Sequence, residues 1–101
     1  MTGEPGLDAL IAEAVVDAHD DEERLSGFYA VIEDNLAVPF QTEVLGVAVT
    51  MEGIDMLPGS GIVAICRRGP HEQAVGILDL PLPAPRPDGA EWIDAFRRWA
   101  G

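Results

Sequence analysis

Residues 16–29 read VDAHDDEERLSGFY and decide how the chain folds. A dense cluster of carboxylates runs here directly into the apolar stripe of a helix. Asp20 is placed to accept a hydrogen bond from the backbone N–H three residues on, and Glu23 to reach back to the Asp20 N–H, which together form a capping box. The pattern therefore predicts that a helix begins at Asp20.

The apolar residues of this helix recur three and four apart, as expected for one buried face: Leu25, Phe28, Tyr29, Ile32 and Leu36. Pro39 ends the helix, because proline lacks the N–H that a helix uses and disfavours the helical conformation in Val38. Upstream, apolar residues at helical spacing predict a first amphipathic helix over residues 7–18. That helix is separated from the next only by the capping box.

The middle of the chain is rich in β-branched residues and predicts short antiparallel strands over 41–50, 54–57, 62–67 and 73–80. Residues 68–72 have the length of a hairpin loop. Alternating prolines from Pro81 to Pro87 predict an extended strap that crosses the surface, since proline cannot join the interior of a sheet.

A second capping-box pattern at Asp88-Gly89-Ala90-Glu91 predicts a last helix, with Trp92, Phe96 and Trp99 on its buried face and Asp94, Arg97 and Arg98 facing out. The expected fold class is α+β. It has N-terminal helices, a four- to five-stranded antiparallel sheet curled into a small SH3-like barrel, and a C-terminal helix.

With 101 residues, the chain is long enough for one domain over residues 1–101. Its net charge is unusual. The sequence has eighteen acidic residues and six basic ones, all arginine, which give a net charge of −12. Residues 1–34 hold ten of the acids and only one arginine. Such a field repels phosphate backbones and anionic lipids and attracts cations and basic partners, so we expect neither nucleic acid nor membrane as a partner.

Cys66 is the only cysteine, so no intrachain disulfide is possible and the reducing cytoplasm is the expected compartment. The N-terminal residues 1–6 lack the pattern of a secretory signal, and no apolar run is long enough to span a bilayer. Cys66 lies inside a predicted strand, where a buried hydrophobic role is expected. An enzyme that uses this thiol would require it to be accessible.

The acids near the start of the second helix are the candidate site. Glu13, Asp17 and Asp21 are four residues apart, so on a continuous helix they would line one face. Side chains that offer only oxygen favour Ca²⁺ or Mg²⁺ over zinc or copper. An EF-hand is excluded, because the sixth residue counted from Asp17 is Glu22 rather than glycine. Water would complete the coordination, so weak binding is expected.

The chain resembles the bacterial CcbP-type calcium-binding proteins. The matching residues are Asp17-Ala18-His19-Asp20-Asp21-Glu22-Glu23, Gly27-Phe28-Tyr29, Glu33-Asp34-Asn35-Leu36 and Pro39-Phe40, and, further on, Thr42–Gly46, Ala64–Gly69, Leu78–Pro83 and Gly89–Asp94. The helix segment with its Gly-Phe-Tyr step is the more specific part. His19 stands where the family is expected to have tyrosine.

The resemblance implies a small cytoplasmic protein that binds Ca²⁺ through acidic side chains, as a buffer or sensor, and catalyses no reaction. Carried over by position, the implied metal ligands are Asp17, Asp20, Asp21, Glu22 and Glu23. The alternative is an acidic protein-interaction module with no specific metal site, whose acidic face binds an Arg/Lys-rich protein partner.

Overall fold

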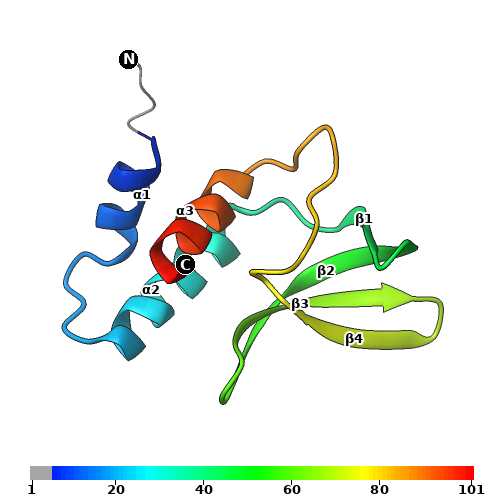
Figure 1. Cartoon of the computed structure of the whole chain (residues 1–101), viewed down its shortest axis with the longest axis horizontal. Helices are drawn as coiled ribbons and strands as arrows, with labels where there is room; N and C mark the ends of the chain where they lie inside the picture. The colour runs from blue at the N-terminus through cyan, green and yellow to red at the C-terminus, as the bar shows by residue number, and fades with distance from the viewer. Residues whose placement is uncertain (1–5) are drawn as a thin grey trace.

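Within residues 6–101, three helices lie together on one side of the molecule and a four-stranded antiparallel sheet on the other (Figure 1). The structure is a computed structural model that describes residues 6–101, so most of the N-terminal segment examined for a secretory signal lies outside it. The elements are α1 (Gly6–Ala14), α2 (Asp21–Asn35), β1 (Phe40–Val44), β2 (Val47–Leu57), β3 (Gly61–Arg68), β4 (His71–Gly76) and α3 (Ala90–Ala100). The α+β class is confirmed.

The strands follow one another in the order β1-β2-β3-β4, each antiparallel to the next. A bulge interrupts the register between Met51 and Gly53 and bends β2. In the described part of the chain, β1 and β4 form the two edges of the sheet and do not pair with each other. The sheet is open, and the expected SH3-like barrel is not confirmed.

The single strand predicted over residues 41–50 is wrong, because a tight turn divides it into β1 and β2. Val44 pairs with Val47, which leaves Leu45 and Gly46 as a two-residue turn. Both turn residues have positive φ, 53° and 78°, as in the type I′ turns that match the twist of a hairpin. The strand predicted at 54–57 is the far end of the same long β2.

The first helix is shorter than the predicted range of residues 7–18. Helix α1 ends at Ala14, and the chain then turns, with Asp17 in the left-handed region at φ 66°. Aspartate tolerates this conformation better than most residues, because its short polar side chain makes local hydrogen bonds. The apolar spacing of Val15 and Ala18 suggested continued helix, but a left-handed residue cannot continue one.

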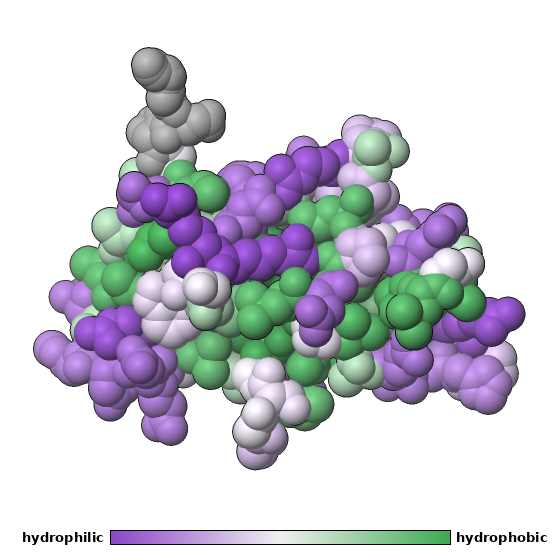
Figure 2. Space-filling view, in the orientation of Figure 1, coloured by the Kyte–Doolittle hydropathy of each residue, from purple (hydrophilic) through white to green (hydrophobic). Residues whose placement is uncertain are grey.

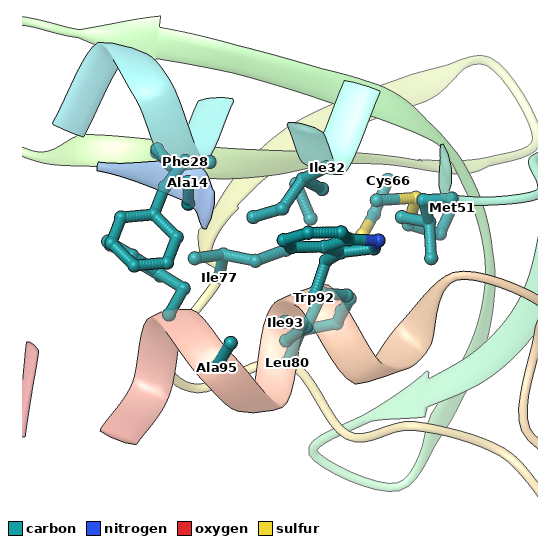
Figure 3. Packing of buried hydrophobic residues seen from close by; sticks show 14 of the residues in the cluster. Ala14, Phe28, Ile32, Met51, Cys66, Ile77, Leu80, Trp92, Ile93 and Ala95 are labelled. Carbon is teal, nitrogen blue, oxygen red and sulfur yellow. The ribbon is translucent and has the colours of Figure 1, made fainter. Parts of the chain in front are cut away.

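The core lies between the helices and the sheet (Figure 3). Phe28 and Ile32 of α2 are fully buried, and so is Met51 of β2. The side chain of Trp92 reaches from α3 toward Cys66 and Met51 on the sheet (Figure 3). Phe28, Phe96 and Trp99 form an aromatic cluster with ring centroids 5.2–6.0 Å apart. The predicted buried faces of α2 and α3 are therefore confirmed, although Leu25, Tyr29 and Trp99 are only partly covered.

The start of α3 differs from the predicted capping box. Gly89 is the N-cap, with φ 88° and no side-chain hydrogen bond, so the prediction that Asp88 and Glu91 cap the helix is wrong. A side chain at Gly89 would collide with the carbonyl of Asn35 at the end of α2. Glycine is therefore required both by the backbone conformation and by this close approach.

Residues 77–89, which include the predicted strap, join β4 to α3. Hydrogen bonds from β1 and from α3 anchor this connection. Thr42 of β1 donates a hydrogen bond to the Pro81 carbonyl at 2.6 Å, and the guanidinium of Arg97 donates to the carbonyls of Ile77 and Leu80. The expectation that Arg97 faces solvent is thus wrong. Strand β4 also ends at Gly76, before the predicted position 80, because the Asp79 N–H turns back to the Gly76 carbonyl.

Candidate functional site

Five carboxylates occupy the seven residues that connect α1 to α2 and begin α2. We call residues 17–23 the acidic turn; its acids are Asp17, Asp20, Asp21, Glu22 and Glu23. All five side chains are exposed, so an ion from solvent reaches them without any rearrangement of the core. The acidic turn is fixed at its two ends, by the last turn of α1 and the first turn of α2.

Two of these acids already accept backbone hydrogen bonds at the start of α2. Asp20 is the N-cap of α2, and its Oδ1 accepts a hydrogen bond from the Glu23 N–H at 2.8 Å, as predicted. The carboxylate of Glu23 accepts from the His19 N–H at 2.7 Å rather than from the Asp20 N–H, so the predicted second half of the capping box is wrong by one residue. Each carboxylate still has a second oxygen available for an ion.

A third acid of the acidic turn is neutralised by an arginine. Asp21 Oδ1 accepts from Arg24 Nη1 at 2.8 Å, in an exposed ion pair between residues three apart on α2. Arg24 is the only base among residues 1–34. An ion that binds Asp21 through Oδ1 therefore competes with Arg24 for that oxygen. Asp17 and Glu22 have no side-chain hydrogen bond or ion pair within residues 6–101.

The arrangement expected from a continuous helix is wrong. Glu13 lies near the end of α1, Asp17 lies in the left-handed turn and Asp21 opens α2, so the three do not share a helix face. Within residues 6–101, no three Asp, Glu, His or Cys side chains are arranged to hold a metal ion together. The assignment of the five acids as metal ligands therefore stays a prediction.

The chemistry available at the acidic turn is hard-cation binding from the surface. Carboxylate oxygens suit Ca²⁺ and Mg²⁺, and water fills the positions that the protein leaves open. The N-terminus of α2 opposes cation binding through its helix dipole, which is equivalent to about half a positive charge. Five negative charges outweigh this dipole, so the field at the acidic turn attracts cations.

A second polar group, formed around Tyr29 near the middle of α2, was not predicted from the sequence. The hydroxyl of Tyr29 lies 3.3 Å from Glu33 Oε2 and 3.3 Å from the Ile54 carbonyl, linking α2 to β2. Burial and the Glu33 carboxylate raise the pKa of Tyr29 above its usual value of 10.0. The helical spacing placed Tyr29 on the core face, but spacing does not reveal a partner twenty-five residues away.

The remaining candidate for chemistry, Cys66, is buried at 1% exposure on β3. Burial raises the pKa of its thiol, which keeps the nucleophilic thiolate scarce. The expected packing role of Cys66 is confirmed by its burial in the core. In the described part of the chain, no helix is long and apolar enough to cross a membrane.

The fold and the acidic turn together define a class of protein: a small α+β protein with a strongly acidic, solvent-exposed connection between its first two helices. A family model described as calcium binding, CcbP, matches residues 8–53 of this chain. This range runs from α1 into β2 and contains the whole acidic turn. Neither the curated proteins nor the solved structures give a match.

The resemblance to the CcbP-type calcium-binding family is therefore confirmed over residues 8–53. The matched range holds eleven of the eighteen acids and one of the six arginines, so the match falls on the acidic part of the chain. Ca²⁺ is the ion that the matched family binds by its description. The similarity expected beyond residue 53, in β3, the strap and α3, stays a prediction.

Proposed function

We propose that this protein binds Ca²⁺ at the acidic turn, through Asp17, Asp20, Asp21, Glu22 and Glu23, and catalyses no reaction. The observation that carries the proposal is the calcium-binding family match over the segment that contains all five acids. Their exposure and their spacing within seven residues support the same conclusion, because an oxygen-rich surface site selects a hard cation.

Binding at this site is weak. The acidic turn offers a few carboxylates to one ion, whereas Ca²⁺ takes about six to eight oxygens, so water supplies the rest. The carboxylates of Asp20 and Glu23 each already accept a hydrogen bond from a backbone N–H, and Asp21 is paired with Arg24. A weak, exposed site suits a cytoplasmic buffer or sensor that exchanges its ion readily.

Calorimetric titration of Ca²⁺ in excess Mg²⁺ tests the site with two matched triple variants. The first combines Asp17→Asn, Asp20→Asn and Asp21→Asn; asparagine at position 20 still caps α2, so the fold is preserved. The control combines Asp79→Asn, Asp88→Asn and Glu91→Gln, which lie outside the matched segment and are exposed. Both variants remove three negative charges.

The proposal predicts that the first variant loses Ca²⁺ affinity by at least about tenfold, while the control stays within about twofold of the parent. Equal losses in both variants would mean that Ca²⁺ responds only to overall charge. In that case the acidic face is better described as an interaction module for an Arg/Lys-rich protein, whose binding would weaken with salt and ignore Ca²⁺.

A further inference from the structure

One end of the sheet carries an apolar groove that the proposed calcium site does not use. The cavity has a volume of about 300 Å³ and is lined by residues of all four strands. This volume is at the lower end of the range for small-molecule sites. We call it the sheet-end groove. It lies on the side of the molecule away from the acidic turn, because its strands project beyond the helices (Figure 1).

The floor of the sheet-end groove continues the core face of the sheet. Cys66 pairs with Met51 on β2 and with Gln73 on β4, so the three side chains share a face. By the same alternation, Val47 and Val49 lie on that face, and so does Val44, which pairs with Val47. Figure 2 shows hydrophobic residues gathered at the right, over the part of the sheet that extends beyond the helices.

The rim of the groove carries an arginine, although the protein is strongly acidic as a whole. Arg68 and His71 form a cross-strand pair on the face of Cys66, and both line the groove. Glu72 also lines it, but Glu72 lies on the alternate position of β4 and pairs with Arg67 at 2.8 Å. Glu72 thus shares Arg67 with Glu52 and makes no ion pair with Arg68 within residues 6–101.

Arg68 is exceptional among the six arginines. Arg24, Arg67, Arg86 and Arg98 each pair with a carboxylate, and Arg97 donates to two backbone carbonyls. Arg68 has no hydrogen bond or ion pair to its side chain within residues 6–101. The Arg68 guanidinium therefore lies at the mouth of an apolar groove without a carboxylate partner in residues 6–101. Such a group is suited to a ligand that has an anionic head and an apolar body.

The turn beside the groove supports the same conclusion. Leu45 is 97% exposed and has φ 53°, although leucine is poorly suited to the left-handed region. Glycine or asparagine would satisfy the turn at lower cost. The leucine side chain lines the groove mouth, where it adds apolar surface for a ligand instead of packing into the core.

We propose that the sheet-end groove binds a small organic acid, with its carboxylate on Arg68 and His71 and its aliphatic body against Val44, Val47 and Val49. The carboxylate accepts two parallel hydrogen bonds from the planar guanidinium, a geometry that arginine favours. The site is independent of the acidic turn and needs no calcium. It is a binding site, with no covalent step.

Octanoate is the probe, titrated into isotope-labelled protein in EDTA and followed by NMR. The proposal predicts saturable shifts at Val44, Val47, Val49 and Arg68. The exposed substitution Arg68→Gln weakens octanoate binding by at least about tenfold, as expected for the loss of charge-assisted hydrogen bonds. Octanol has the same chain length without the carboxylate, and its affinity is lower than that of octanoate by a similar factor.

Arg98→Gln is the matched control, because it removes the same charge from the helical side, where Arg98 pairs with Asp8. This variant keeps the parent affinity. The proposal is overturned if octanoate gives no saturable shifts, if the shifts lie away from the groove, or if Arg68→Gln binds octanoate no more weakly than Arg98→Gln. Octanol binding as tight as that of octanoate would also overturn it.

Discussion

The carbonyl of Ala14, at the end of α1, lies against the α-carbon of Gly27, in the second turn of α2, so closely that no side chain fits between them. This contact fixes how far the chain must travel between the two helices. The acidic turn lies within that interval, so the position of its backbone depends on this packing rather than on one continuous helix. The proposed calcium site therefore depends on a close contact between two backbone segments.

Gly27→Ala therefore destabilises the fold. The new Cβ would overlap the Ala14 carbonyl, so α1 must move away from α2, and overpacking of this kind costs about 1–3 kcal/mol. Urea unfolding followed by tryptophan fluorescence measures the loss. Gly53→Ala is the control, because a Cβ there meets nothing within 4 Å. A Gly27→Ala protein as stable as the parent would contradict the close approach.

Arg24→Gln increases Ca²⁺ affinity. Removing the guanidinium frees Asp21 Oδ1 and removes a positive charge beside the site, and exposed pairs of this kind correspond to a gain of about two- to fivefold. Calorimetry compares it with Arg86→Gln, which removes the same charge from the Asp94 pair outside the matched segment. Equal gains in both variants would contradict a calcium site that includes Asp21.

Tyr29→Phe lowers the free energy of unfolding at neutral pH by about 0.5–1.5 kcal/mol, because the single hydroxyl proton that Glu33 and the Ile54 carbonyl share as acceptors is lost. The measurement is chemical unfolding of the two proteins at the same pH. A variant with unchanged stability would show that these two contacts contribute nothing.

The parent protein loses stability as the pH rises through the folded-state pKa of Tyr29. Because that pKa is raised above 10.0, the folded protein holds the phenol proton more tightly than the unfolded chain does. The contribution is complete below pH 10 and disappears above the raised pKa. Tyr29 is the only tyrosine, so tyrosinate absorbance reports it alone. In Tyr29→Phe the alkaline decline becomes shallower, and what remains includes Cys66, whose thiol pKa is also raised.

Leu45→Asn stabilises the protein by about 1 kcal/mol, because asparagine adopts positive φ at lower cost than leucine and the 97% exposed leucine gives up almost no packing. Leu45→Ala provides the comparison. Alanine keeps the Cβ that makes the conformation costly, so its stability should stay close to that of the parent. Thermal unfolding of the three proteins distinguishes relief of backbone strain from loss of the side chain.

The sequence predicted correctly those elements that depend on the local residue pattern alone. The buried face of α2 followed from the spacing of Phe28 and Ile32, and the strap followed from its prolines. The β1–β2 hairpin was missed because Leu45-Gly46 lacks the asparagine or aspartate typical of a type I′ turn. Residues 41–50 consequently looked like one uninterrupted strand.

Features that depend on contacts between distant segments could not be predicted from the sequence. The end of α1 at Ala14 is accompanied by close packing on Gly27, and the Gly89 cap is required by the nearby Asn35 carbonyl. At the site, the sequence identified the Asp20 cap but neither the Asp21–Arg24 competition nor the Tyr29 link to β2. The pairing of Arg68 with His71 at the rim of the sheet-end groove is seen only once the β3–β4 hairpin brings the two residues together.

The most direct test of the account is an NMR titration of the labelled parent protein with Ca²⁺ in excess Mg²⁺, following every backbone amide. We predict saturable shifts concentrated in residues 17–23 and extending only into the adjoining first turn of α2. Saturable shifts centred elsewhere, for example on the acids of the strap or α3, or shifts that grow without saturation across the whole surface, would contradict calcium binding at the acidic turn.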